Sequence, residues 1–177
     1  AALVALNLKS LVWNLRAHAA WKGTEGAAKF AKTNAQSQLM ALPLALAMSV
    51  NGLFIAGLVF VPGLWGVIEV LFPLAIVAFL AISVLAFRIY GAFLGRVLTE
   101  GGFNCAANNS FGQMLPAFAF AMIGVGLRAP AALSSHAAVA GIGLGLSVFL
   151  LATALVIAGL GLILGFRSMM ENGAAPE

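Results

Sequence analysis

Four long apolar segments with almost no charge constrain the fold of this chain more than any other feature. They cover residues 40–61, 64–87, 111–127 and 137–166. A helix needs roughly 20 apolar residues to cross a hydrocarbon core about 30 Å thick. Three segments reach that length, and segment 111–127 lies at the short end of the range. The sequence therefore predicts an all-α, polytopic membrane protein built from transmembrane helical hairpins.

The basic residues predict how the chain is oriented. Eight of the nine precede the first span, follow the second or follow the fourth: Lys9, Arg16, Lys22, Lys29, Lys32, Arg88, Arg96 and Arg167. Only Arg128 falls on the other side. Because cytoplasmic loops are enriched in Lys and Arg, we expect the N-terminal connector and the C-terminal tail in the cytoplasm. The hairpin turns are then expected at Pro62-Gly63 and near Ala129-Pro130.

These segments divide the chain into parts of one membrane domain. Residues 1–16 are expected to end a membrane helix that leaves the bilayer near Trp13. A signal peptide is disfavoured because the basic residues follow the apolar stretch. Connectors 17–39 and 88–110 precede hairpins 40–87 and 111–166, and 167–177 form a polar tail. Segment 17–39 is a plain connector or an interfacial amphipathic helix. In 88–110, Gly101-Gly102 ends a helix, and Asn109 or Ser110 caps the next. The apolar start and loop-like end predict a segment of a longer protein.

An internal repeat links the two outward spans. Asn34 and Gln38 match Asn109 and Gln113 at an offset of 75, and an Ala-x-Ala-Met motif recurs at an offset of 74. Pro43 and Pro116 follow in each copy. A proline inside a spanning helix frees a carbonyl, which is tolerated only where protein or water satisfies it. The repeat predicts proline-kinked inner helices alternating with outer helices, although Pro73 departs from this division. Chance similarity between apolar helices is the alternative.

Polar and small residues in the spans have two interpretations each. Asn51 lines a pathway or bonds to a neighbouring helix. Glu69 lies at the outer interface beside Trp65, or pairs with Arg128. His136 marks the start of the fourth span. Small residues four apart favour close helix packing or oligomerisation, and the fourth span carries two such pairs: Gly141, Gly145, Gly161 and Gly165.

No enzyme site is predicted. The chain contains no aspartate, its two histidines lie far apart, and its carboxylates are unpaired. Cys105 is a single cysteine, reactive or incidental, so neither a disulfide nor a multi-cysteine metal site is expected. We expect no cofactor and no metal, and no nucleic-acid partner because no basic stripe interleaves with aromatics.

A small anion is the expected substrate of a pore, since small residues and helix ends can supply positive potential without buried carboxylates. The expected pore-lining residues are Pro43, Ala47, Asn51, Pro116, Phe120 and Gly124.

This pattern resembles the tellurite-resistance/dicarboxylate transporter family, which includes TehA-like proteins and slow anion channels. More closely, stretches 34–48, 60–65 (FVPGLW), 69–73 (EVLFP), 88–90 (RIY) and 96–103 (RVLTEGGF) are similar to TsoY-type membrane proteins. The resemblance covers most of residues 9–170. It implies a ring of five hairpins around a pore, commonly a trimer, in the bacterial inner membrane.

The same resemblance limits what this chain does alone. It implies that the chain holds the end of a second helix and helices three to six, without the family's pore-blocking phenylalanine. Phe118 and Phe120 do not match that motif. The primary expectation is movement of a small anion through a helical path. The alternative is a structural or accessory transmembrane subunit that docks on a larger membrane complex through its glycine-rich fourth helix.

Overall fold

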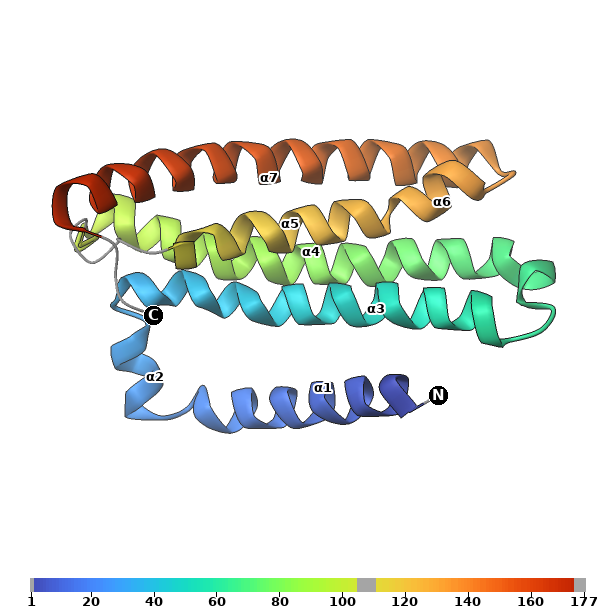
Figure 1. Cartoon of the computed structure of the whole chain (residues 1–177), viewed down its shortest axis with the longest axis horizontal. Coiled ribbons are helices and arrows are strands. Elements are labelled where there is room, and N and C mark those ends of the chain that lie inside the picture. The colour runs from blue at the N-terminus through green and yellow to red at the C-terminus, as the bar shows by residue number, and fades with distance from the viewer. Residues whose placement is uncertain (1, 105–110, 174–177) are drawn as a thin grey trace.

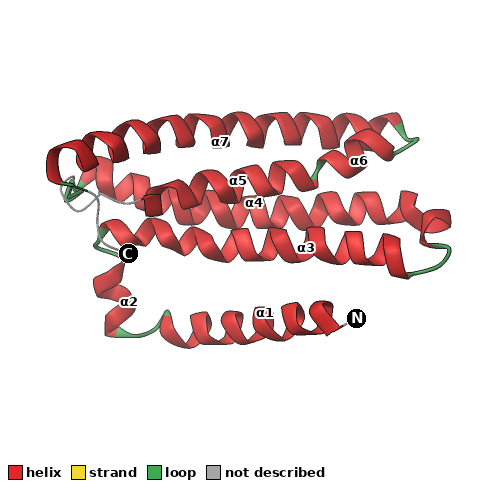
Figure 2. Cartoon of the chain, viewed as in Figure 1, coloured by secondary structure: helices red, strands yellow, loops and turns green. Residues whose placement is uncertain are grey.

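The computed structural model describes residues 2–104 and 111–173 as a bundle of helices (Figure 1). Helices make up 89% of the structure, and the described residues contain no strand (Figure 2). The α-helices are α1 (Ala2–Trp21), α2 (Glu25–Phe30), α3 (Ala41–Phe60), α4 (Ile68–Thr99), α5 (Leu115–Gly126), α6 (Arg128–Leu133) and α7 (Ala137–Asn172). Short 3-10 segments precede three of them: η1 (Asn34–Met40), η2 (Leu64–Val67) and η3 (Phe111–Met114).

Four stretches are long and apolar enough to cross a membrane. They are Asn34–Phe60, Leu64–Thr99, Phe111–Leu133 and Ala137–Asn172. The prediction of an all-α chain with four such spans is confirmed at this level. Two helices continue past their expected ends. Helix α4 ends at Thr99 instead of Phe87, and α7 ends at Asn172 instead of Phe166, so Arg88, Arg96 and Arg167 lie within these helices.

Helix α5 holds the centre of the bundle. It packs chiefly against α7 and α3, and α4 also contacts it. Its side chains Phe120 and Ile123 are fully buried, and Leu150 of α7 and Phe79 of α4 close the core around them. Phe87 and Tyr90 place further rings against Phe120, with centroids 4.7 and 6.3 Å away. Helix α3 and the outer side of α7 remain more exposed.

The two repeated prolines stand at equivalent places but do not interrupt an α-helix. Pro43 is the third residue of α3 and Pro116 the second of α5, each directly after a 3-10 segment. The first four N–H groups of a helix have no intrahelical acceptor, so a proline there removes no hydrogen bond. The expectation that these two prolines kink the spans is therefore wrong. What the two copies share is a 3-10 start followed by a proline.

The two hairpin turns differ in how well the sequence located them. The first is confirmed: α3 ends at Phe60, and Gly63 adopts φ +76°, a conformation that glycine reaches without strain. The second was expected near Ala129-Pro130 and instead lies at residues 134–136, after α6. Pro130 is the third residue of α6, and a proline is tolerated in the first turn of a helix, so the chain does not reverse there.

The connectors are partly helical. After α4, Gly101 and Gly102 both have positive φ, which confirms the predicted helix end there. Segment 17–39 contains the short helix α2, whose Thr24 hydroxyl accepts a hydrogen bond from the N–H of Ala27. The predicted cap at Asn109 or Ser110 and the predicted cysteine, Cys105, lie outside the described residues.

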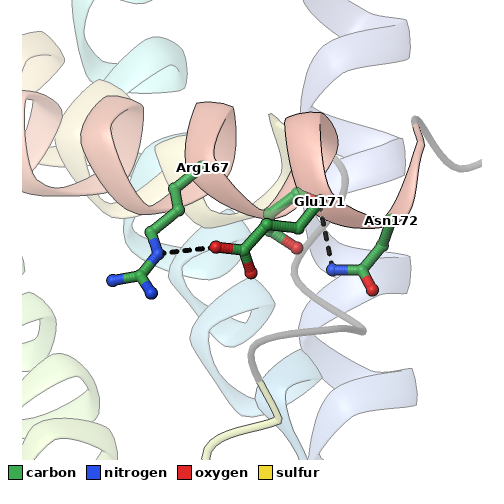
Figure 3. Close-up of polar contacts among 4 residues, drawn as sticks. Arg167, Glu171 and Asn172 are labelled. Carbon is green, nitrogen blue, oxygen red and sulfur yellow. Dashed lines mark hydrogen bonds and ion pairs between the residues drawn. The ribbon is translucent and has the colours of Figure 1, made fainter.

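Several charged residues lie near the ends of the helices. Arg96 and Arg167 lie at the same end of the bundle as α2, and α6 with Arg128 lies at the opposite end (Figure 1). At the end of α7, the Arg167 guanidinium Nε pairs with the Glu171 carboxylate at 2.9 Å, and Asn172 donates to the Ser168 carbonyl (Figure 3). Both partners of this pair are largely exposed, so it contributes little stability.

Helix α1 continues further than expected. It was expected to leave the bilayer near Trp13, but it runs to Trp21 and packs along α3 (Figure 1). Trp21 then contacts the Phe30 ring edge-on at 5.3 Å, which joins α1 to α2. As a result Lys9, expected with the other basic residues at one end of the bundle, lies beside the middle of α3.

Candidate functional site

The third span bends between α5 and α6, and Pro130 explains the bend. Pro130 has no N–H to donate to the carbonyl of Gly126, four residues earlier, and its ring disfavours a straight helix at that point. Helix α5 accordingly ends at Gly126 and α6 begins at Arg128 (Figure 1). The span therefore bends at Pro130, where the sequence predicted a turn, and not at Pro116, where it predicted a kink.

Side chains of two neighbouring helices bond to the last turn of α5. The Asn51 amide of α3 donates to the carbonyl of Met122 at 3.3 Å. The Ser147 hydroxyl of α7 donates to the carbonyl of Gly124 at 2.8 Å, in a buried position. Both contacts satisfy carbonyls next to the bend, where the regular helix ladder is ending. Of the two interpretations of Asn51, the bond to a neighbouring helix is thus observed.

Gly126 lets α3, α4 and α5 approach at the bend. A Cβ at this position would lie 2.2 Å from Cζ of Phe79 and 2.6 Å from Oδ1 of Asn51. Both distances are far below van der Waals contact, so only glycine fits without displacing these side chains. The close approach holds Asn51 beside the end of α5.

A cavity of about 300 Å³ opens at this point. It is bounded by α3, α4, α5 and α6, and its lining includes Asn51, Ile55, Phe79, Val125 and Gly126. Asn51 is the one polar side chain in the lining, and the rest of the wall is apolar. The cavity lies within the spanning part of the bundle. The bend between α5 and α6, the amide of Asn51 and the apolar wall of the cavity are therefore adjacent.

Five of the six expected pore-lining residues point into the packed core of this chain. Ala47 and Phe120 have no exposed surface, and Pro43, Pro116 and Gly124 are also buried. Only Asn51 reaches the cavity. The free faces of α3 and α5 carry other residues, among them Met48, Ile55, Val59, Phe118 and Val125, all more than half exposed. Sequence reasoning missed these because burial between neighbouring helices cannot be read from one apolar helix.

The expected packing glycines fall into two groups. Gly161 lies against Met114 of η3, where an added Cβ would be 3.1 Å from the sulfur, and Gly165 is buried. Gly141 and Gly145 are exposed, and nothing lies within 4 Å of a Cβ placed there. The close approach of α7 to α6 uses Gly143 instead, whose added Cβ would be 3.0 Å from the N atom of Ala131. The predicted pair Gly141 and Gly145 thus lies on either side of Gly143 in the sequence but on another face of α7.

A polar network joins the starts of the two outward spans at the opposite end. Arg96 of α4 donates from Nε to the Gln36 amide oxygen at 2.9 Å and from Nη2 to the Thr33 carbonyl at 3.0 Å. Asn34 exchanges two hydrogen bonds with the backbone of Asn104, and Gln113 donates to the Asn34 carbonyl at 3.1 Å. The repeated Asn34 and Gln113 thus meet across the bundle.

Glu69 is held by the link between α6 and α7. Its carboxylate accepts from the Ser134 hydroxyl and from the Ser135 N–H, both at 2.7 Å. In the described part of the chain Glu69 forms no ion pair with Arg128, so the alternative interpretation of Glu69 is not observed. Two short hydrogen bonds from one loop satisfy the carboxylate instead. His136 stands directly before α7, as expected, and donates its N–H to the Ser134 hydroxyl.

We expect Glu69→Gln to loosen this link. The amide can accept only one of the two hydrogen bonds, since its NH₂ group faces a donor. The free energy of unfolding should fall slightly, because these hydrogen bonds are exposed to solvent, and denaturant titration in mixed micelles measures it. Glu100→Gln, at the exposed end of α4, is the matched control and should leave stability unchanged. Equal stability of both variants would mean that the two hydrogen bonds of Glu69 contribute nothing to stability.

Comparison with known proteins identifies no relative. No family model, no curated protein and no solved structure matches the chain. Among the residues that the structure describes, no three His, Cys, Asp or Glu side chains come together in a group that could hold a metal ion.

Proposed function

We propose that this chain forms part of the wall of a path for a small anion, in a membrane protein of the TehA-like type. The bend at Gly126 carries the proposal. Discontinuous membrane helices commonly form substrate and ion sites near the midplane, because the freed backbone must line a cavity or bond to protein. Here the bend adjoins a cavity of about 300 Å³ with an amide in its wall.

The charge distribution favours an anion over a cation. Helices α3 and α5 contain no charged residue. Arg96 lies at one end of these helices, beside Gln36 and Thr33, and Arg128 follows the bend at the other. The carboxylate of Glu69 is engaged by two serines. Basic residues at both mouths and none of opposite sign between them suit a negatively charged solute.

The proposed arrangement keeps α3 and α5 as inner helices and α4 and α7 as outer ones. Met48 and Ile55 of α3, with Phe118 and Val125 of α5, are free in this chain and would face the path once further helices close it. The family resemblance adds a homo-oligomer, by analogy a trimer, in a bacterial inner membrane. The end with Arg96 and Arg167 is then cytoplasmic, by the excess of basic residues there.

Halide flux into liposomes tests the proposal. Protein purified from its native membrane should admit iodide, followed by quenching of an enclosed halide-sensitive dye. Ile55→Trp fills the cavity and should slow the flux at least severalfold. Ile163→Trp, on a side chain of α7 that is 68% exposed, is the matched control and should leave it unchanged. Equal flux through both variants would show that the cavity is not part of the path.

A lateral docking role is the second candidate, favoured by the exposed Gly141 and Gly145. Nothing in the described part of the chain covers these glycines, and exposed small residues four apart allow close helix approach. We expect the double variant Gly141→Leu/Gly145→Leu to release the protein from any larger membrane complex on native gels. An unchanged migration would leave this glycine pair facing lipid.

A further inference from the structure

Lys9 lies at the depth of the middle of α3. The gap between α1 and α3 is lined by Val4 and Leu8 on one side and by Leu53 and Phe60 on the other. The two helices run antiparallel (Figure 1), so Leu8 lies level with the part of α3 between Leu53 and Gly57, and Lys9 lies one residue nearer the middle of α3. Helix α3 has 20 residues, which span about 30 Å, the thickness of the hydrocarbon core. Lys9 is therefore within about one turn of the bilayer midplane.

Lys9 points away from α3. The residues of α1 that are half-buried against the bundle include Val4, Leu11 and His18, seven positions apart. At 3.6 residues per turn, Lys9 lies about 160° around the helix from Leu11. Its side chain is exposed. The charge thus occupies the face of α1 that no other described element covers.

A lysine in this position has no acceptable lipid environment. A charge at the bilayer centre is costly, and intramembrane charges usually face protein or water and pair with a partner. The nearer interface is then about 10 Å away, too far for the side chain to bring its ammonium group to the headgroups. In residues 2–104 and 111–173 the ion pair present is Arg167–Glu171, so Lys9 has no carboxylate partner there.

Other polar side chains are exposed on α1, but on other sides of the helix. At 3.6 residues per turn, Asn7 and Asn14 lie about 160° and about 140° around the helix from Lys9, and Ser10 lies about 100° from it. Although it lies beside α3, α1 is not among the stretches apolar enough to span a membrane by themselves. A partner for Lys9 therefore has to come from a helix that packs on its own side of α1.

We propose that the exposed face of α1 binds a transmembrane helix of a partner subunit that carries a carboxylate opposite Lys9. Charge complementarity identifies the partner's chemistry. A second copy of this chain is a poor candidate, because the chain has no aspartate and both glutamates within its four spans are engaged. Glu69 accepts two hydrogen bonds, and Glu171 pairs with Arg167 at the end of α7. The proposal is independent of the anion path, which lies along other faces of α3 and α5.

Synthetic membrane peptides test this surface. Two labelled poly-leucine helices, identical except for Glu or Gln at the centre, are reconstituted in liposomes with the labelled protein, and association is measured by energy transfer. We expect the Glu peptide to bind about 5- to 30-fold more tightly, the range that corresponds to one interhelical polar contact. Lys9→Met should abolish the preference and Lys9→Arg should keep it. Lys22→Met, one residue beyond α1, is the matched control and should behave like the original chain.

Three outcomes would overturn the proposal. Equal binding of the two peptides to the original chain would show that Lys9 meets no carboxylate. A preference that survives in Lys9→Met would place the contact elsewhere. Energy transfer between two differently labelled copies, lost in Lys9→Met without any peptide, would assign the face to self-association. None of these results depends on halide flux, so the two proposals fail separately.

Discussion

Replacing Gly126 by alanine is expected to destabilise the bundle more than the same replacement at any other glycine in the described part of the chain. The added Cβ would lie 2.2 Å from Cζ of Phe79 and 2.6 Å from Oδ1 of Asn51. Phe79 is 2% exposed, so its ring can move only into the adjoining cavity, and it would lose its present packing. Overpacking of this kind costs about 1–3 kcal/mol, which should appear as a lower free energy of unfolding in mixed micelles.

The matched control is Gly91→Ala in α4. Nothing lies within 4 Å of a Cβ at Gly91, and alanine favours helix over glycine by about 1 kcal/mol. Gly91→Ala should therefore be neutral or slightly stabilising. If Gly126→Ala matched it, the three helices would not meet at the bend as closely as described, and the cavity beside Asn51 would be wider.

The second large effect is expected from Arg96→Met. The substitution keeps much of the side-chain volume but removes both donors to the segment before α3. Gln36 is 9% exposed, so its amide oxygen would be left without a partner in a place that water hardly reaches. An unsatisfied buried polar group costs about 1–3 kcal/mol. Amide hydrogen exchange should also rise in η1, because Arg96 holds its start.

Arg88→Met, two turns earlier on the same helix, is the matched control. Arg88 is exposed, and no hydrogen bond or ion pair of its side chain is found among the described residues. It should lose little stability and leave exchange in η1 unchanged. An equal loss in both variants would mean that the effect comes from charge at the membrane surface rather than from the Gln36 contact.

The sequence predicted what depends on one helix at a time. Length and apolarity located the four spans, and glycine geometry located the first turn and the end of α4. The repeat pairs Gln38 with Gln113, and both lie in the 3-10 segments that begin the outward spans. The counterpart of Asn34, Asn109, lies outside the described residues. The sequence did not predict the hydrogen bond between Gln113 and Asn34.

What depends on contacts between helices was not predicted. A turn was expected at Pro130, since Ala-Pro has the same local signature whether the chain reverses or merely bends. Gly143, rather than Gly141 or Gly145, packs against α6 because the rotation of α7 is set by its neighbours. Ala47 and Phe120 are core residues for the same reason: an apolar helix does not mark which of its faces meets protein.

The most direct test of the anion path is the reversal potential of the current carried by the protein in a planar bilayer under a KCl gradient. Protein purified from its native membrane should conduct, and the potential should lie close to the chloride equilibrium value, because Arg96 and Arg128 flank helices that carry no charge. A potential close to the potassium value, or a bilayer that stays silent, would contradict the account.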